Sequence, residues 1–98
     1  MSTKTDSFDS TMSAEAVLDG FESLVKEKGW KLKDRDGDAA VAKKGLNART
    51  LGDKIEISAD AVEGGRTRVN VTVSSVQVVD WGSNDDIAEA IRLRFADV

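Results

Sequence analysis

Apolar residues in the first third of the chain recur with the period of an α-helix. They stand three or four positions apart: Ala14, Val17, Leu18, Phe21, Leu24 and Val25. This spacing places one apolar stripe along a helix with 3.6 residues per turn. Ser13 is a suitable N-cap. Gly29 suits the left-handed position after the last turn, from which Trp30 can fold back on Val25. Gly20 inside this helix costs up to about 1 kcal/mol relative to Ala, which indicates close packing there.

The segment after this helix has the pattern of a short β-hairpin. Residues 30–33 alternate apolar and basic side chains, and Asp36-Gly37 is a two-residue turn sequence. A turn at those two residues pairs Leu32 with Val41. It leaves the following side chains of the hairpin on the solvent face: Lys31, Lys33, Ala40, Ala42 and Lys44.

The same turn, with the sequence DRDGD at residues 34–38, also resembles a calcium-binding loop. An EF-hand loop needs Gly at its sixth position and Glu at its twelfth. Counted from Asp34, Gly37 is fourth and the twelfth position is Gly45. We therefore favour a plain turn and expect no metal site.

Residues 54–61 and 67–73 alternate strictly between apolar and polar, and the phase of that alternation determines the loop between them. A two-residue Gly64-Gly65 loop would set Ile57 opposite Thr72. A three-residue loop that also includes Glu63 keeps all apolar side chains on one face, since successive side chains point to opposite faces. We expect a type I turn with Gly65 at a left-handed bulge position.

The end of the chain predicts a strand break, a corner and a closing helix. The apolar phase shifts after residue 73, so we expect a bulge, bend or break at Ser74-Ser75, followed by a candidate fifth strand. A helix is expected over residues 84–97, capped by Ser83 or Asn84. One of its faces carries Ile87, Ala88, Ile91, Phe95 and Val98, whereas Leu93 lies on the opposite face.

These elements predict an α+β fold, a two-layer sandwich in the order α-β-β-β-β-α with an optional fifth strand before the last helix. Both helices would cover one face of an antiparallel sheet. Residues 1–12 are expected to be a disordered polar tail, and residues 13–98 a single domain, which suits a chain of 98 residues.

Composition limits the chemistry that such a domain can perform. The chain contains no cysteine and no histidine, which excludes disulfides, Cys/His zinc sites and imidazole acid–base catalysis. Residues 1–12 lack the apolar core of a secretion signal, and the longest apolar run, residues 39–42, is far too short to span a membrane. We therefore expect a soluble cytoplasmic protein that is not an enzyme and carries no cofactor. An enzyme is the last alternative, and it would need a Ser or Thr nucleophile activated by Lys or a carboxylate, which no spacing in the chain singles out.

The corner before the closing helix, Val79-Asp80-Trp81-Gly82-Ser83-Asn84, resembles a group of small bacterial α+β domains. In that group a strand ends in a hydrophobic-Asp-Trp-Gly-x-Asn corner before a C-terminal helix. Gly29-Trp30 and Lys43-Lys44-Gly45 are similar too, so that the resemblance spans about residues 20–96. The group has no assigned activity, so the resemblance implies a fold and no catalytic residues. Ser83 stands where such relatives often have a basic residue.

Within this corner we expect structural roles for Asp80, Trp81, Gly82 and Asn84. Trp81 would close the end of the core, because a large aromatic ring between a strand and a helix is usually buried. Asp80 would accept backbone N–H groups.

Charge is unevenly spread along a chain whose net charge is −4. Residues 26–54 carry nine Lys or Arg and five acids, a local charge of +4. The most basic surface is therefore predicted around the loop 45–53, with Lys43, Lys44, Arg49 and Lys54 as candidate binding residues for an anionic partner or a protein. Nucleic-acid binding is the alternative, but the predicted open sheet face lacks the exposed aromatics that stack on bases.

Overall fold

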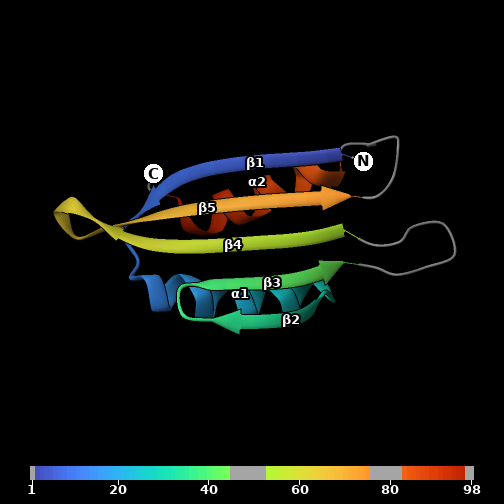
Figure 1. The fold of residues 1–98 in the computed structure, drawn as a ribbon, viewed down its shortest axis with the longest axis horizontal. Helices are drawn as coiled ribbons and strands as arrows, with labels where there is room; N and C mark the ends of the chain where they lie inside the picture. The colour runs from blue at the N-terminus through green and yellow to red at the C-terminus, as the bar shows by residue number, and fades with distance from the viewer. Residues whose placement is uncertain (1, 45–52, 76–82, 97–98) are drawn as a thin grey trace, which may run out of the picture.

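The computed structural model describes residues 2–44, 53–75 and 83–96 (Figure 1). These residues form two α-helices and five strands, β1 (Ser2–Ser10), α1 (Ala14–Lys28), β2 (Lys31–Asp36), β3 (Ala39–Lys44), β4 (Asp53–Val62), the short 3₁₀ turn η1 (Glu63–Gly65), β5 (Arg66–Ser75) and α2 (Ser83–Phe95). The sheet is antiparallel, with the strand order β1-β5-β4-β3-β2. Both helices lie behind it in Figure 1, with α1 behind β2 and β3 and α2 behind β1 and β5. The predicted α+β two-layer sandwich is confirmed.

Strand β1 corrects the prediction of a disordered tail at residues 1–12. Residues 2–10 pair along their whole length with β5, and Phe8 lies opposite Val69 in the core. Phe8 is the single apolar side chain in β1, so no local pattern revealed the strand. The ladder on β5 supplies its backbone hydrogen bonds instead. The fifth strand therefore stands at the start of the chain, and the candidate fifth strand after Ser75 lies outside the described residues.

Helix α1 has the predicted ends. The Ser13 hydroxyl accepts a hydrogen bond from the backbone N–H of Ala16 at 3.1 Å. Gly29 has a left-handed φ of 75° and donates to the carbonyl of Lys26 at 3.2 Å. Trp30 donates to the carbonyl of Val25 at 2.9 Å, which completes a Schellman motif.

The hairpin β2–β3 differs from its prediction by one residue. Its turn is Gly37-Asp38 rather than Asp36-Gly37, since Asp36 already pairs with Ala39. Gly37 has a φ of +57°, which favours glycine at the first position of the turn. The register also shifts between residues 32 and 34, where β2 contains an irregularity.

The irregularity in β2, and not the displaced turn, reverses the predicted faces of β3, because moving a two-residue turn by one position changes each pairing by two residues and keeps the faces. Ala40 and Ala42 lie opposite Ile57 and Ile55 and are buried under the helices, whereas they were predicted to face solvent. A slip of one residue in register moves every side chain of a strand to the other face. Arg35 also faces the helices and contacts Asp19 of α1 at 2.7 Å.

The hairpin β4–β5 has the predicted register. Ile57 lies opposite Val71, as a three-residue loop requires, and all three residues of η1 separate the paired ends of the strands. The turn type is different, because Gly64 as well as Gly65 is left-handed, with φ of 79° and 73°. The ladder reaches Ser75 without a register shift, so no bulge interrupts the described part of β5, whose last residue is Ser75. A bend or break beyond Ser75 would lie outside the described residues.

Helix α2 buries the predicted face. Ile87, Ala88, Ile91 and Phe95 lie in the core, and Leu93 is 76% exposed. Val98 and the corner residues Asp80, Trp81 and Gly82 lie outside the described residues, as does the side chain of Asn84. No helix in the described part of the chain is both long enough and apolar enough to cross a membrane.

Candidate functional site

The structure separates the four predicted binding residues. Lys43 and Lys54 lie opposite each other on the open face of the sheet, the face that the helices leave uncovered. Lys44 lies on the helix side, opposite the buried Asp53. Arg49 falls outside the described residues. The basic surface predicted from the sequence is therefore divided between two faces of the sheet.

A different lysine completes the arrangement on the open face. Lys31 of β2 lies opposite Lys43 of β3, which in turn lies opposite Lys54 of β4. We call Lys31, Lys43 and Lys54 the lysine row. Its members stand on adjacent strands, where opposite residues have Cα atoms about 4.5–5.5 Å apart. All three side chains are exposed.

The charges of the lysine row are only partly neutralised within the described part of the protein. Lys54 Nζ lies 3.0 Å from Glu56 Oε1. Among the described residues, neither Lys31 nor Lys43 has an ion-pair or hydrogen-bond partner. Like charges directly opposite each other across two strands destabilise a sheet. An anion bound between them would relieve that repulsion.

The pairing of Lys31 with Lys43 was not predicted, because a register that pairs Leu32 with Val41 sets Trp30 opposite Lys43. The shift in β2 near Lys33 is what brings Lys31 into line. No glycine or other bulge signal stands at that position. The only available sign was the basic alternation of residues 31 and 33, which already placed both on the open face.

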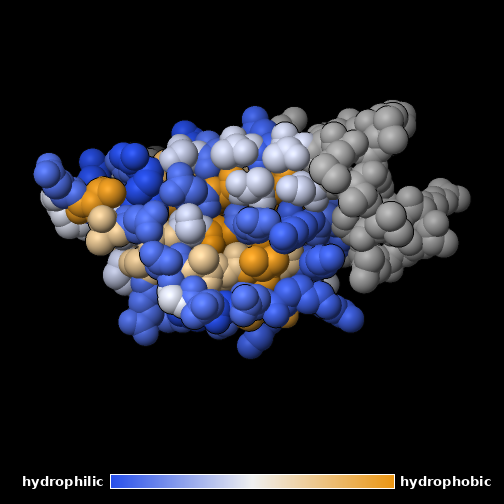
Figure 2. Space-filling model, viewed as in Figure 1, coloured by the Kyte–Doolittle hydropathy of each residue, from blue (hydrophilic) through white to orange (hydrophobic). Residues whose placement is uncertain are grey.

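The rest of the open face is polar and carries both signs of charge. Figure 2 shows a mostly hydrophilic surface, with a small hydrophobic area over the middle strands. Arg68 Nε donates to Asp9 Oδ1 at 2.6 Å, and this hydrogen bond holds the pKa of the Asp9 carboxyl below its usual value. The same bond raises the pKa of the Arg68 guanidinium. In the described strands no aromatic side chain points out from this face, because Phe8 is buried and Trp30 packs against the core.

Two carboxyls meet beside the β2–β3 turn that resembles a calcium loop. A side-chain hydrogen bond with Asp38 raises the pKa of Asp60. The backbone holds this pair together, since Ala59 N–H donates to the carbonyl of Asp38 at 2.8 Å. The neutral form of the Asp60 carboxyl is therefore favoured beside Asp38.

Lys44 lines a small hollow of about 220 Å³ at the end of the helix layer. Its other walls are Lys28 and Trp30 at the end of α1, and Asp86, Ile87 and Ala90 of α2. The half-buried Trp30 was predicted to close α1 and to begin the following strand, but not to line a hollow, which depends on how α2 packs beside it.

No protein-family model matches this sequence, and comparison with curated proteins finds no match. Among solved structures, Ara h 8.0201 is similar at 12% identity over 93% of this chain and 90% of that chain, with a TM-score of 0.47. An uncharacterised protein from Bacillus thuringiensis is similar at 14% identity over 96% of this chain and 93% of that chain, with a TM-score of 0.48. At these values neither likeness bears on function.

Proposed function

We propose that this chain is a non-catalytic binding module that holds an anionic partner on the open face of its sheet. The observation that carries the proposal is the lysine row, three cations in register on adjacent strands. Lys31 and Lys43 have no partner among the described residues, so their charges are available to a ligand.

The surroundings of the lysine row favour a compact anionic group over a long polyanion. In the next row of the open face, Asp34 and Glu56 flank Val41 on either side. A phosphate, sulfate or carboxylate group can sit between two ammonium groups without approaching these acids. An extended nucleic-acid backbone crossing the strands would meet them, and the described face offers no aromatic ring on which bases could stack. Nucleic-acid binding is therefore the weaker alternative.

A cytoplasmic location is part of the proposal. The complete lack of cysteine fits a reducing compartment, where proteins do not use disulfides for stability.

The neighbours Lys43 and Lys44 provide a matched pair of variants for the test. They differ by one position in the sequence and lie on opposite faces of β3. We would titrate the parent, Lys43→Gln and Lys44→Gln at low salt with three probes, inorganic phosphate, an acidic peptide and phosphatidylglycerol micelles, and follow amide shifts by NMR. The proposal predicts that Lys43→Gln weakens binding of at least one probe whereas Lys44→Gln does not.

Salt provides the second arm of this experiment. Binding through exposed lysines should weaken between low and physiological ionic strength, since charges are screened over about 8–10 Å there. Equal losses in the two variants, binding that ignores salt, or no binding of any probe would overturn the lysine row as the site.

A further inference from the structure

Strand β1 forms one edge of the sheet described here, with β5 on one side of it. In an antiparallel ladder the backbone groups of alternate residues point to opposite sides of a strand. Every second N–H and C=O of β1 therefore points away from β5. Such an edge is a template on which another strand can pair, and proteins usually protect it.

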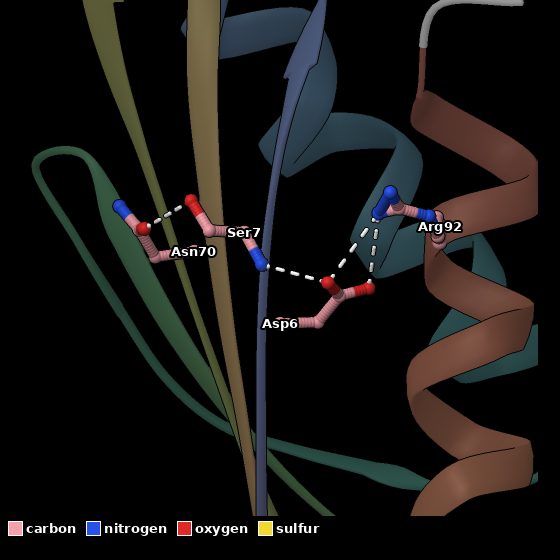
Figure 3. A network of polar contacts seen from close by, with 4 residues as sticks. All are labelled: Asp6, Ser7, Asn70 and Arg92. Atoms are coloured by element: carbon pink, nitrogen blue, oxygen red, sulfur yellow. Dashed lines mark hydrogen bonds and ion pairs between the residues drawn. The ribbon is translucent and has the colours of Figure 1, made fainter.

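Ser7 shows which residues point outward and how one of them is protected. Its backbone N–H donates to Asp6 Oδ1 at 2.9 Å, so this N–H is turned to the carboxylate. Its hydroxyl donates to Asn70 Oδ1 of β5 at 2.9 Å. Figure 3 shows these two bonds leaving Ser7 in opposite directions. The outward set is therefore Thr3, Thr5, Ser7 and Asp9, and the Asp6 side chain occupies the N–H of Ser7.

Arg92 of α2 holds that carboxylate in place. Arg92 Nη1 lies 3.3 Å from Asp6 Oδ1 and 3.4 Å from Oδ2 (Figure 3). The guanidinium also lies over the ring of Phe8, 5.6 Å from its centroid, a cation–π geometry. Asp6 and Arg92 are 25% and 50% exposed, so the contact lies at the margin of the edge and not in the core.

The opposite edge is protected in a different way. Strand β2 has only six residues, contains the register shift between residues 32 and 34, and exposes Lys31 and Lys33. A short, irregular and charged strand resists pairing. Strand β1 has nine residues and a regular register, so neither shortness nor irregularity protects it.

We propose that the β1 edge is an interaction surface for a second copy of this chain, and that Asp6, held by Arg92, keeps it closed. A two-fold arrangement centred on Thr5 would pair the two β1 strands in antiparallel fashion. Thr3 would then lie opposite Ser7 of the other copy, so the pairing needs the N–H that Asp6 occupies. It would also set Lys4 opposite Asp6 of the other copy on the helix side, a charge pairing that Asp6→Ala gives up and that is weaker than the charge-assisted hydrogen bond removed by the same change. The lysine row is on β2 to β4, so this inference does not depend on the proposed function.

The test compares Asp6→Ala with Asp9→Ala. Both variants remove one negative charge from β1, but Asp9 contacts Arg68 and leaves the N–H of Ser7 occupied. By sedimentation velocity, Asp6→Ala should self-associate at least about tenfold more strongly than the parent, as expected when a charge-assisted hydrogen bond at the edge is lost. Asp9→Ala and Asp6→Asn, which keeps an acceptor for Ser7, should remain as monomeric as the parent. A monomeric Asp6→Ala, or equal association of Asp9→Ala, overturns the proposal.

A cross-link identifies the surface at which association occurs. The chain has no cysteine, so a single introduced thiol reports cleanly. In the Asp6→Ala background, Thr5→Cys should form a disulfide-linked dimer, whereas Thr72→Cys should not. Thr72 lies opposite Thr5 but on the interior strand β5. Association of the Thr5→Cys variant without a disulfide between its copies would rule out the β1 edge.

If Asp6→Ala does not fold, hydrogen exchange in the parent tests whether Asp6 closes the β1 edge. The N–H groups of Ser7 and Thr5 point to the same outer side of β1, but only that of Ser7 is bonded to Asp6. The Ser7 amide should exchange at least about tenfold more slowly, as a hydrogen-bonded amide does. Equal exchange rates would show that Asp6 does not close the edge.

Discussion

The ring of Phe95 occupies the space that a side chain at Gly20 would need. A Cβ atom at residue 20 would lie 2.6 Å from Cε1 and 3.1 Å from Cζ of that ring. Phe95 is 3% exposed and belongs to the core, so the ring has little room to move away. This contact is the reason for a glycine inside α1, and it joins the two helices at one point.

Gly20→Ala should therefore destabilise the protein by about 1–3 kcal/mol, the usual effect of overpacking a core. This result would oppose helix propensity, which favours Ala over Gly by about 1 kcal/mol. Urea unfolding followed by circular dichroism measures the difference. Ser23→Ala, at an exposed position of the same helix, is the control and should change stability little. A Gly20→Ala variant that is more stable than the parent would show that Phe95 yields easily.

Gly65→Val should destabilise the β4–β5 hairpin by about 1–2 kcal/mol, because a β-branched residue is strained at positive φ. The φ of Gly65 is +73°, and no atom lies within 4 Å of the added Cβ, so the effect comes from the backbone and not from crowding. Glu63→Val is the control, since the positive φ angles of this turn are those of its glycines. Equal urea midpoints for Gly65→Val and the parent would contradict the left-handed turn.

The contact between Asp9 and Arg68 should make the free energy of unfolding depend on pH in the acidic range. The Arg68 hydrogen bond lowers the pKa of Asp9 in the folded state from its ordinary value of 3.8. The folded state therefore binds this proton less readily than the unfolded state. The contribution of the contact to the free energy of unfolding is present above the unfolded pKa of Asp9 and is lost as pH falls through its folded pKa. Asp9→Asn should lose less stability than the parent between about pH 6 and pH 3, a range that spans the usual Asp pKa. Equal acid sensitivity in urea titrations would count against the contact.

The pair Asp38 and Asp60 should make stability depend on pH in the opposite direction. The pKa of Asp60 is raised above 3.8 in the folded state by its side-chain hydrogen bond with Asp38. The folded state then binds the proton more readily, so stability from this pair is present at low pH and is lost as pH rises through the folded pKa. Asp60→Asn should raise the urea midpoint at neutral pH and have less effect near pH 3. A lowered midpoint at neutral pH would mean that the two carboxyls do not repel each other.

The sequence by itself determined the elements whose packing follows from a local period. The stripe from Val17 to Val25 specifies α1, and Ser13 and Gly29 specify its ends, because capping involves residues within one turn. The register of β4 on β5 also followed from the sequence, since only an odd loop keeps Ile57 and Val71 on one face. The corner at Asp80 and Trp81 lies outside the described residues and stays a prediction.

Only the tertiary structure decided the features that depend on partners distant in the chain. Strand β1 forms because β5, far along the chain, provides the backbone partners of its ladder. The single apolar residue of β1, Phe8, gives no alternating pattern from which a strand could be predicted. The face of β3 relative to Leu32 was decided by the one-residue irregularity near Lys33, which the alternation of apolar and polar residues does not indicate. The same irregularity brings Lys31 opposite Lys43. A register is a property of two strands together, so one strand's sequence cannot specify it unless the turn and the spacing between them do.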